Sequence, residues 1–357
     1  MNTTEQLTKS LTAARKTWLL TGVAGFIGSN LLEALLRANQ SVVGLDNFST
    51  GHQRNLDDVR RNVGEALWEN FVLMRSDIVD LEACRKACAG ADYVLHQAAI
   101  GSVPRSIQNP LPTHQSNVDG FVNMLCAAKE AQVKRFVYAS SSSVYGDHPG
   151  LPKVEQSIGD CLSPYAVSKR INELYADVFA KCYGTEYIGL RYFNVFGPRQ
   201  DPNGVYAAVI PKWISAMLTG QPIYINGDGE TSRDFCFVAN VVQANLRAAT
   251  TQNPNAPNQI YNIAAAKRTT LNQLFELLRE RLSPRFPHLK ELRPIYREFQ
   301  KGDVRHSHAD IGRARELLEY NPTYDVEGGL TEALDWYIEH SQNREPSEPR
   351  AQAPAGR

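Results

Sequence analysis

Short apolar runs alternate along the chain with longer segments whose apolar residues recur every three or four positions, from residue 18 to about residue 190. Runs of the first kind predict buried strands, and the second spacing predicts helices that bury one face. This alternation predicts an α/β fold with a Rossmann-type, doubly wound parallel sheet. Strands are expected at residues 18–21, 41–45, 71–75, 93–96, 135–139 and 187–190, and the longest helices at 111–131 and 164–183.

The pattern loosens beyond about residue 197, where proline-rich loops separate the apolar segments. We expect a smaller mixed α/β domain there, lying over the carboxyl ends of the strands, where such folds bind ligands. Its expected strands are residues 223–225 and 260–263, and its expected helices are 271–282, 311–318 and 330–339. The predicted division is an N-terminal extension (1–15), a Rossmann domain (mainly 16–197), a substrate domain (mainly 198–340, with the chain crossing between them) and a disordered tail (341–357).

The charge balance narrows the range of partners. The 38 basic residues equal the 38 acidic ones, so the sequence predicts neither a nucleic-acid partner nor a membrane partner. No apolar run approaches the roughly 20 residues that a bilayer requires, and the N-terminus carries no apolar signal core. The six cysteines lack paired C-x-x-C spacing; Cys84 and Cys88 would form at most half of a metal site, and we expect reduced thiols and no metal. A cytoplasmic protein is expected.

Three glycines spaced three apart, in the motif TGVAGFIG, follow the first predicted strand and open a helix: Gly22, Gly25 and Gly28. The first would permit a tight turn, the second would let a diphosphate approach, and the third would let the helix pack close to the strand. The next strand ends at Asp46, where an acid can hold ribose hydroxyls. This acid favours NAD, because the 2′-phosphate of NADP would meet its charge. His52 and Arg54 are the alternative argument for NADP, although a solvated loop also explains them.

A second motif, SPYAVSK, predicts a helix start with chemistry on it. Ser163 suits an N-cap and Pro164 the first helical turn, which leaves Tyr165 and Lys169 four apart on one face. A phenol of pKa about 10 is a poor base at pH 7, but a nearby ammonium and a positive nicotinamide ring would favour phenolate. The alternative is an exposed lysine beside a half-buried tyrosine.

Four serines at residues 140–143, in the motif SSSSVYG, follow the strand expected at 135–139. They are either a plain turn or hydroxyls that contact a sugar hydroxyl as it is oxidised. Serine, tyrosine and lysine together would form a proton relay for hydride chemistry at a carbinol carbon.

These motifs resemble those of the extended short-chain dehydrogenase/reductases that modify nucleotide sugars, over residues 16–340. The chain most resembles the bacterial UDP-N-acetylglucosamine (UDP-GlcNAc/UDP-GalNAc) 4-epimerases, which share GSVPRS at 101–106 and GDVRHS at 302–307. Further shared motifs are LDNFSTG at 45–51, SDI at 76–78, HQAA at 96–99, RYFNVFG at 191–197 and NGDGETSRDF at 226–235.

The resemblance implies a catalytic set in which Ser141 is the hydroxyl partner, Tyr165 the acid/base and Lys169 the ribose-binding residue that lowers the tyrosine pKa. It implies contacts to NAD from Gly22, Gly25, Phe26, Ile27, Gly28, Asp46, Asn47, Ser49, Thr50, Gly51, Asp77, Ile78, Gln97, Ala98, Ala99, Asn117, Tyr165, Lys169, Tyr192 and Val195. It implies contacts to the UDP-sugar from Ser102, Val103, Ser141, Ser142, Ser143, Tyr165, Asn194, Val209, Tyr224, Asn226, Arg233, Asp303 and Ser307.

One position departs from the family pattern. Gln300 stands three residues before Asp303, where the family has an arginine that contacts the diphosphate. Lys301 would supply a charge, but a point charge does not replace a bidentate fork. The departure favours weaker UDP binding.

The resemblance also discriminates among reactions. Related 4,6-dehydratases and decarboxylases carry an acidic residue where this chain has Ser142 and Ser143, so the chain is expected to epimerise its substrate. Ser307 aligns with a small residue that admits a 2-N-acetyl group, which predicts UDP-GlcNAc/UDP-GalNAc interconversion and weaker action on UDP-Glc/UDP-Gal. Arg105 and Arg305 leave open a uronic acid substrate such as UDP-GlcNAcA. A non-catalytic NAD-binding sensor or scaffold is the alternative of another class.

The family also implies a homodimer, formed by the helices at 111–131 and 164–183 and their copies. A role in surface polysaccharide synthesis is the corresponding expectation for the pathway.

Overall fold

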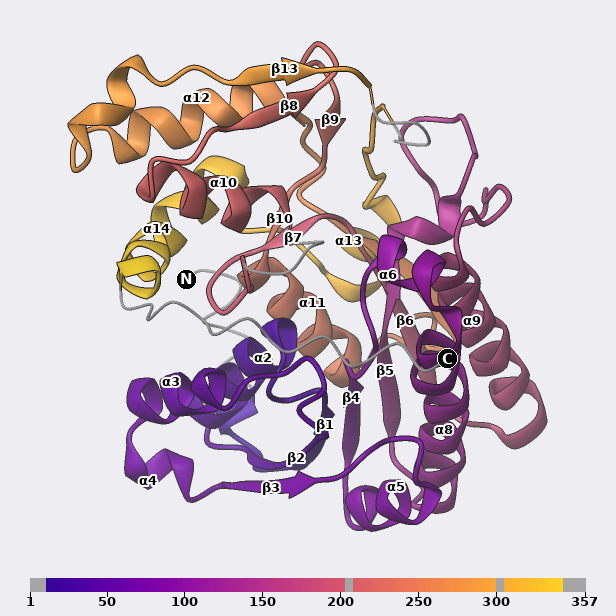
Figure 1. Ribbon diagram of the computed structural model, residues 1–357. Coiled ribbons are helices and arrows are strands. Elements are labelled where there is room, and N and C mark those ends of the chain that lie inside the picture. Colours follow the sequence, from indigo (N-terminus) through magenta and orange to yellow (C-terminus); the bar gives the residue numbers. More distant parts are fainter. Residues whose placement is uncertain (1–10, 203–207, 300–304, 343–357) are drawn as a thin grey trace, which may run out of the picture.

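The computed structural model of the 357-residue chain describes residues 11–202, 208–299 and 305–342. Its centre is a seven-stranded sheet in the order β11-β6-β5-β4-β1-β2-β3, and every neighbouring pair is parallel (Figure 1). The predicted doubly wound sheet is confirmed. The strands are β1 (Thr17–Thr21), β2 (Ser41–Asp46), β3 (Phe71–Arg75), β4 (Tyr93–His96), β5 (Arg135–Ser141), β6 (Tyr187–Tyr192) and β11 (Gln259–Ile263).

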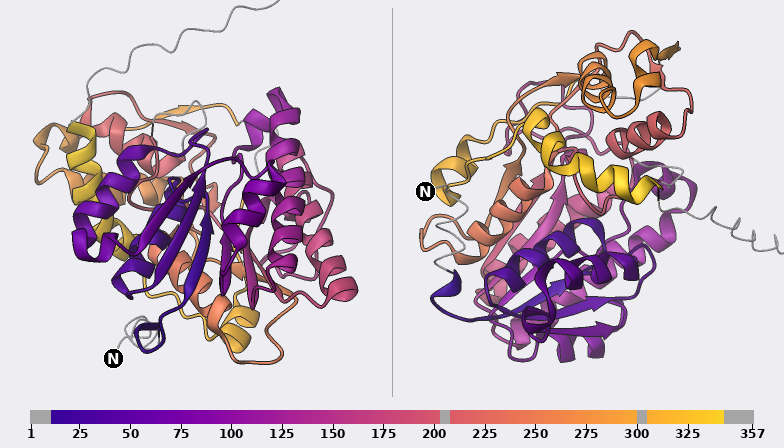
Figure 2. Two further views of the ribbon diagram at one scale, coloured as in Figure 1. Left: turned by 90° about the horizontal axis from the view of Figure 1, so that it is seen from below. Right: turned by 90° about the vertical axis from the view of Figure 1, so that its left-hand side faces the viewer.

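Helices cover both faces of this sheet (Figures 1 and 2). One face packs against α2 (Phe26–Arg37), α3 (Gln53–Val63) and α11 (Val238–Thr250) in one apolar core. The other face packs against α5 (Leu81–Cys88), α8 (Gly120–Glu130) and α9 (Pro164–Tyr183) in a second core. A short α4 (Glu65–Trp68) precedes β3. Crossovers of this kind return each strand parallel to the last, so all carboxyl ends share one edge.

The single helix expected at residues 111–131 is instead a continuous run of three segments. These are α7 (Pro110–His114), a π-helical turn η1 (Gln115–Asp119) and α8. A π turn inserts one residue into the helical ladder, and such turns often occur at functional sites. Asn117 lies in the middle of this turn.

The strand expected at residues 260–263 does not belong to the smaller part of the fold. It is β11, which pairs with β6 at the edge of the main sheet. After β6 the chain therefore leaves the sheet and returns to it through α11 and β11, and α13 (Gly312–Leu318) packs beside β11.

A third apolar core lies beyond the carboxyl edge of the sheet. It is formed by α10 (Val209–Leu218), α12 (Leu271–Leu282), α14 (Val326–Gln342) and β8 (Tyr224–Asn226), and the exposed strand β13 (Ile295–Arg297) pairs in parallel with β8. The remaining short elements are α6 (Val103–Gln108), η2 (Ser142–Tyr145), β7 (Val195–Phe196), β9 (Ser232–Arg233), β10 (Cys236–Phe237), β12 (Thr269–Thr270) and η3 (Pro287–Glu291).

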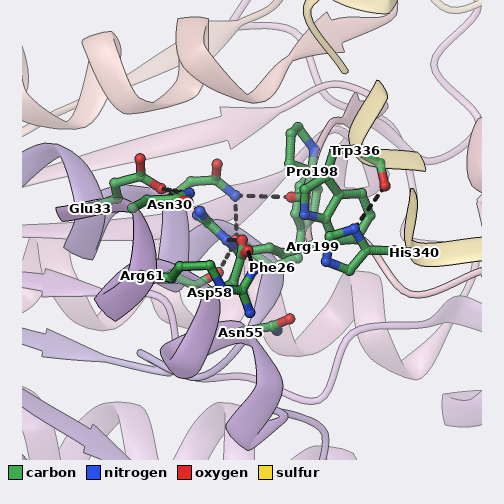
Figure 3. A network of polar contacts seen from close by, with 12 residues as sticks. Phe26, Asn30, Glu33, Asn55, Asp58, Arg61, Pro198, Arg199, Trp336 and His340 are labelled. Carbon is green, nitrogen blue, oxygen red and sulfur yellow. Dashed lines mark hydrogen bonds and ion pairs between the residues drawn. The ribbon is translucent and has the colours of Figure 1, made fainter. Parts of the chain in front are cut away.

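A buried arginine ties this outer part to the sheet (Figure 3). The Nε of Arg199 donates to the Asp58 carboxylate of α3 at 2.7 Å, and its Nη2 pairs with Glu33 of α2. The preceding carbonyl, of Pro198, accepts from Asn30 of α2 at 3.1 Å. The segment that follows β7 is therefore held against the two helices beside the first strand.

The C-terminal helix holds the same segment from its other side. The hydroxyl of Tyr337 donates to the Gly197 carbonyl at 2.9 Å and accepts from its N–H at 3.1 Å. Figure 3 shows Trp336 and His340 of α14 next to Pro198 and Arg199, and the two α14 rings stack 4.1 Å apart. The ion pairs of Arg199 thus lie between α2, α3 and α14.

Replacing Arg199 with Met should lower the free energy of unfolding by about 3 kcal/mol, because two largely buried carboxylates lose their buried partner and keep only the exposed Arg37 and Arg61. Burial raises the pKa of Glu33, but its contacts with Arg199, Arg37 and Asn62 together outweigh burial and leave the pKa lowered, with Arg199 the largest of the three. A carboxylate with a lowered pKa contributes stability above its unfolded pKa of about 4.3, and this contribution is lost as the pH falls through the folded value. The deficit of the variant should therefore be full at pH 7 and shrink below about pH 4, as measured by urea unfolding.

The matched control is Arg60→Met, which removes an exposed ion pair with Glu65 and should leave the unfolding midpoint unchanged. Equal midpoints for the wild type and the Arg199 variant at pH 7 would contradict the role given to Arg199.

Candidate active site

The glycine motif forms the turn between β1 and α2. Gly22 has φ +68°, and a Cβ there would lie 2.8 Å from the Ala98 N. A Cβ on Gly28 would lie 2.0 Å from the Gly22 carbonyl oxygen, so both positions require glycine. Gly25 is the N-cap of α2 and offers no capping side chain, which leaves the first N–H groups of this 12-residue helix without an intrahelical partner. Backbone donors at a helix N-terminus fit a diphosphate.

Asp46 ends β2 beside this turn. Its Oδ2 accepts from the Ala24 N at 2.8 Å, and its Oδ1 accepts from the Phe48 N at 2.7 Å. Burial raises the pKa of Asp46 above its ordinary value, although the two backbone hydrogen bonds act to lower it. The Asn55 amide donates to the Ala24 carbonyl at 2.8 Å, so α3 also supports the turn.

The loop after β2 carries the predicted cofactor residues Asn47, Ser49, Thr50 and Gly51. The Asn47 amide donates to the Asp77 carboxylate at 2.6 Å, which brings the two predicted loops together. The Arg75 guanidinium lies 4.2 Å from the Phe48 ring centroid, a contact that no motif indicated.

The two basic residues that could favour NADP have a partner within the protein. His52 lies 3.2 Å and Arg54 3.5 Å from the Asp201 carboxylate. These contacts agree with the solvated-loop interpretation.

At the end of β4, Gln97 belongs to a closed polar network. Its amide donates to the Asn245 side chain at 3.0 Å and its oxygen accepts from the Tyr192 hydroxyl at 3.1 Å. Asn245 of α11 in turn donates to Tyr192 at 2.8 Å. Sequence reasoning missed Asn245, which lies in no motif; the cofactor roles of Gln97 and Tyr192 remain predictions.

The π turn places Asn117 against the loop that follows β4. Its side chain accepts from the Ile100 N at 2.7 Å, and donates to the Ile100 carbonyl at 3.2 Å and to the Ser168 hydroxyl at 3.1 Å. Ser106 of α6 accepts from the Tyr165 N at 3.1 Å. The predicted substrate residues Ser102 and Val103 thus lie at the start of α6, a helix that is hydrogen-bonded to α9.

The predicted helix start at Ser163 is confirmed, since its hydroxyl accepts from the Ala166 N at 3.1 Å and Pro164 is the first helical residue. Tyr165 hydrogen-bonds to Ser141 at the end of β5, and Ser143 donates to the Ser141 hydroxyl at 2.9 Å. The structure therefore brings the predicted catalytic hydroxyls together.

Lys169 lies on the same face of α9 as Tyr165, with its Nζ 6.0 Å from the tyrosine ring centroid. The ammonium donates to the Ala139 carbonyl of β5 at 2.8 Å. Burial lowers the pKa of Lys169 to about 8. Burial also raises the pKa of Tyr165, while the hydrogen bond with Ser141 acts to lower it. In the protein alone the tyrosine pKa is thus raised, and the expected lowering by Lys169 is not seen.

The predicted UDP residues lie on the elements beyond the sheet edge. Asn194 has φ +34° and donates to the Asp234 carbonyl at 3.4 Å, and Val209 begins α10. Tyr224 and Asn226 lie on β8, and the Arg297 guanidinium stacks 3.3 Å from the Tyr224 ring centroid. Arg297 is a further basic residue on this ribbon that the sequence motifs did not indicate.

The backbone of Ser232 of β9 contacts two further residues that the sequence predicts to bind the substrate, Arg233 and Ser307. Its carbonyl accepts from the Ser307 N at 3.0 Å and from the Arg233 guanidinium at 3.0 Å. Arg233 also donates to the Arg305 carbonyl at 3.2 Å. Three further residues with predicted roles lie outside the described residues: Gln300, Lys301 and Asp303.

The motifs on this edge match a known family model. Residues 18–264 match the NAD dependent epimerase/dehydratase family. The chain belongs to this family. The cofactor of the family is NAD, and the glycine turn, the free N-terminus of α2 and the Asp46 carboxylate fit it.

Relatives of several specificities resemble the chain over nearly its whole length. The UDP-glucose 4-epimerase of Mycolicibacterium smegmatis is 33% identical over 326 residues, covering 91% of this chain and 99% of that enzyme. The UDP-N-acetylglucosamine 4-epimerase of Methanobrevibacter ruminantium M1, solved with UDP-N-acetylmuramic acid, is 38% identical with a TM-score of 0.82, covering 91% and 99%. The UDP-glucuronic acid 4-epimerase of Bacillus cereus, solved with UDP-glucuronic acid and NAD, is 30% identical with a TM-score of 0.79, covering 91% and 99%.

The helices of the described ranges include none that is both long and apolar enough to span a bilayer.

Replacing Gly28 with Ala should weaken NAD binding by about tenfold or more. The new Cβ would lie 2.0 Å from the Gly22 carbonyl, so the turn must shift and lose hydrogen bonds to a charged diphosphate, each worth about 1.5 kcal/mol or more. NAD released from the denatured, purified protein measures the occupancy.

The matched control is Gly328→Ala within α14, where a Cβ would meet only ordinary contacts of 3.4 Å and longer. This variant should retain NAD. Full NAD occupancy in the Gly28 variant would contradict the proposed binding of the diphosphate at the glycine turn.

Proposed function

We propose that the protein interconverts UDP-N-acetylglucosamine and UDP-N-acetylgalactosamine by epimerisation at carbon 4, with weaker action on UDP-Glc and UDP-Gal. The family and its solved relatives support the coarser assignment, an NAD-dependent UDP-sugar 4-epimerase. The observation that carries the proposal is the meeting of Ser141, Tyr165 and Lys169 at the edge where the glycine turn lies.

The residues of the site suit a reversible proton transfer. Tyr165 would take the proton of the 4-hydroxyl and return it after the sugar has turned, and Ser141, hydrogen-bonded to this phenol, would share that proton. Lys169 would bind the nicotinamide ribose and add positive charge beside the phenol. Bound NAD supplies the hydride acceptor at carbon 4 and returns the hydride to the other face of the 4-keto sugar.

The segment next to Ser141 supports epimerisation over elimination. Elimination of water or decarboxylation would call for a second acid or base near the oxidised sugar. The two residues that follow are Ser142 and Ser143, and the Ser143 hydroxyl donates back to Ser141. Oxidation followed by return of the hydride requires only the groups already named.

The position of Ser307 supports the N-acetylated sugar. This small residue lies on the segment that pairs with β9, next to Arg233, and the relative from Methanobrevibacter ruminantium M1 is a UDP-N-acetylglucosamine 4-epimerase. A side chain of this size leaves room for an acetamide.

A uronic acid substrate is the second candidate, because the Bacillus cereus relative acts on UDP-glucuronic acid. Arg305 pairs with Asp228 at 2.6 Å, and its guanidinium lies 5.3 Å from the Phe299 ring centroid. Arg105 on α6 is exposed, and within the described part of the chain its guanidinium has no hydrogen-bond or ionic partner. Arg105 is therefore the better candidate for a sugar carboxylate.

The exposed apolar residues of α9 support the homodimer proposal. Val167, Leu174, Tyr175 and Val178 are exposed and recur at helical spacing, and Leu111 of α7 is exposed nearby in the same helical layer. Such a face would be covered if these helices paired with their copies. Synthesis of a surface polysaccharide remains the proposed setting.

Incubating the purified protein with UDP-GlcNAc and no added cofactor should yield UDP-GalNAc, detected by NMR, because the reaction regenerates its own NAD. The Tyr165→Phe variant should lose about 10²- to 10⁴-fold in kcat, since it lacks the acid–base group, and should retain NAD and its fold. Conversion of UDP-GlcNAcA alone would instead favour the uronic acid candidate. Unchanged turnover in the Tyr165 variant would contradict the catalytic assignment, and no turnover of either sugar by the wild type would favour the NAD-binding sensor or scaffold.

Replacing Ser307 with Tyr should lower kcat/KM for UDP-GlcNAc by at least about tenfold, because the ring would fill the volume that the acetamide needs. Turnover of UDP-Glc should be retained. Ser307→Ala, which keeps the volume small, is the matched control and should preserve both activities. The gate proposal fails if the tyrosine variant turns over UDP-GlcNAc as the wild type does.

A further inference from the structure

A buried carboxylate lies directly behind the proposed catalytic hydroxyls. Glu173 of α9 is fully buried and binds Arg191 of β6 in bidentate fashion, with Nε to Oε1 at 2.8 Å and Nη2 to Oε2 at 2.9 Å. Arg170, one turn earlier on α9, donates to Oε2 at 3.0 Å. The hydroxyl of Ser140 donates to Oε1 at 2.7 Å. One carboxylate thus joins a helix to two neighbouring strands.

The strand register makes this junction specific. Ser140 of β5 and Arg191 of β6 are direct partners in the parallel ladder, and both contact Glu173. The residues on either side of Ser140 are also engaged by α9, since Ala139 accepts from Lys169 and Ser141 hydrogen-bonds to Tyr165.

The three contacts form a ladder between α9 and the end of β5. Tyr165, Lys169 and Glu173 are spaced four apart, one helical turn each, and they meet three consecutive residues of the strand. Two of these contacts are made by Tyr165 and Lys169, the residues proposed to move protons and to hold the cofactor. The third contact is made by Glu173, which has no proposed role in proton transfer or cofactor binding.

We infer that Glu173 is a positioning residue, which holds the end of β5 through Ser140 so that Ser141 faces Tyr165. This inference rests on the proposed roles of Ser141, Tyr165 and Lys169. It also distinguishes the roles of the serines at residues 140–143, because the Ser140 hydroxyl is bonded to Glu173 while those of Ser141 and Ser143 bond to each other.

Stabilisation of the fold does not by itself explain why Glu173 and Arg191 are paired in the core. Desolvating a carboxylate and a guanidinium costs free energy that their attraction only partly returns, and well-packed apolar residues often stabilise a core as much or more. A bidentate pair with an added hydroxyl does provide fixed geometry, because the planar guanidinium and the carboxylate allow one relative orientation.

The test replaces Ser140 with Ala, which removes the link to the strand and leaves the ion pairs of Glu173 in place. We expect kcat to fall by about ten- to a hundredfold, the effect of a small misplacement of a reacting group. KM for the UDP-sugar and NAD occupancy should change by less than about twofold, because most of their proposed binding residues lie on other elements. The assay uses whichever of UDP-GlcNAc and UDP-glucose the wild type converts.

The pH profile of kcat is the second readout. The hydrogen bond with Ser141 acts to lower the pKa of Tyr165, so a displaced Ser141 should move the acid limb of the profile to higher pH. Lys169 on the same helix faces this phenol, with its Nζ 6.0 Å from the ring centroid, and His96 of β4 interacts electrostatically with Lys169. Burial lowers the pKa of His96 to about 3, so His96 stays neutral throughout.

The matched control is Arg170→Gln, which removes another partner of the same carboxylate but no contact with β5. It should leave kcat and the pH profile near those of the wild type. The inference is overturned if Ser140→Ala keeps the wild-type kcat and pH profile, or if Arg170→Gln loses as much activity. Retained turnover in Tyr165→Phe would instead overturn the catalytic roles themselves, so the two failures are distinguishable.

Discussion

Parallel pairing of the central strands is the constraint on which the site depends. Because neighbouring strands run the same way, their carboxyl ends meet at one edge. The glycine turn follows Thr21 of β1, and Asp46 ends β2 beside it. Ser141 and Tyr192, the last residues of β5 and β6, are direct partners in the ladder. Segments more than a hundred residues apart in sequence are thereby placed within one site.

Two buried ion pairs lie near the same edge. Glu173 pairs with Arg191 behind the proposed catalytic hydroxyls, and Asp58 pairs with Arg199 at the junction with the outer elements. An unpaired charge at either place would be strongly destabilising. Both pairs join elements from different layers, so they hold the two sides of the site in register as well as satisfying their own charges.

Local patterns predicted the parts of the fold that local physics decides. The six strands between residues 17 and 192 are apolar runs that end in polar or glycine-containing segments, and the start of α9 follows from a serine cap and a proline. β11 escaped assignment to the main sheet because a short apolar run carries no information about which strand it will join. The π turn escaped because helical spacing over five residues does not distinguish the two ladders.

For the candidate site, too, the sequence indicated the residues that stand in local motifs and missed those that do not. Ser141, Tyr165 and Lys169 stood in motifs, and the structure brings them together. Asn245 and Glu173 act through partners far away in the sequence, so no spacing rule points to them. The raised pKa of Tyr165 could not be foreseen either, because it depends on burial that a sequence does not specify.

On the proposed substrate side of the site, one residue, Ser307, sets the space for the sugar and another, Arg233, provides positive charge. Ser307 and Arg233 are both fixed to the backbone of Ser232, one through its N–H and the other through its guanidinium. With the roles proposed for them, a change in the size of residue 307 would alter the space for the sugar without removing the charge near the diphosphate. The proposed catalytic hydroxyls belong to β5 and α9 and are not part of that junction. Such a division is consistent with relatives of similar fold that are named for UDP-glucose, UDP-N-acetylglucosamine and UDP-glucuronic acid.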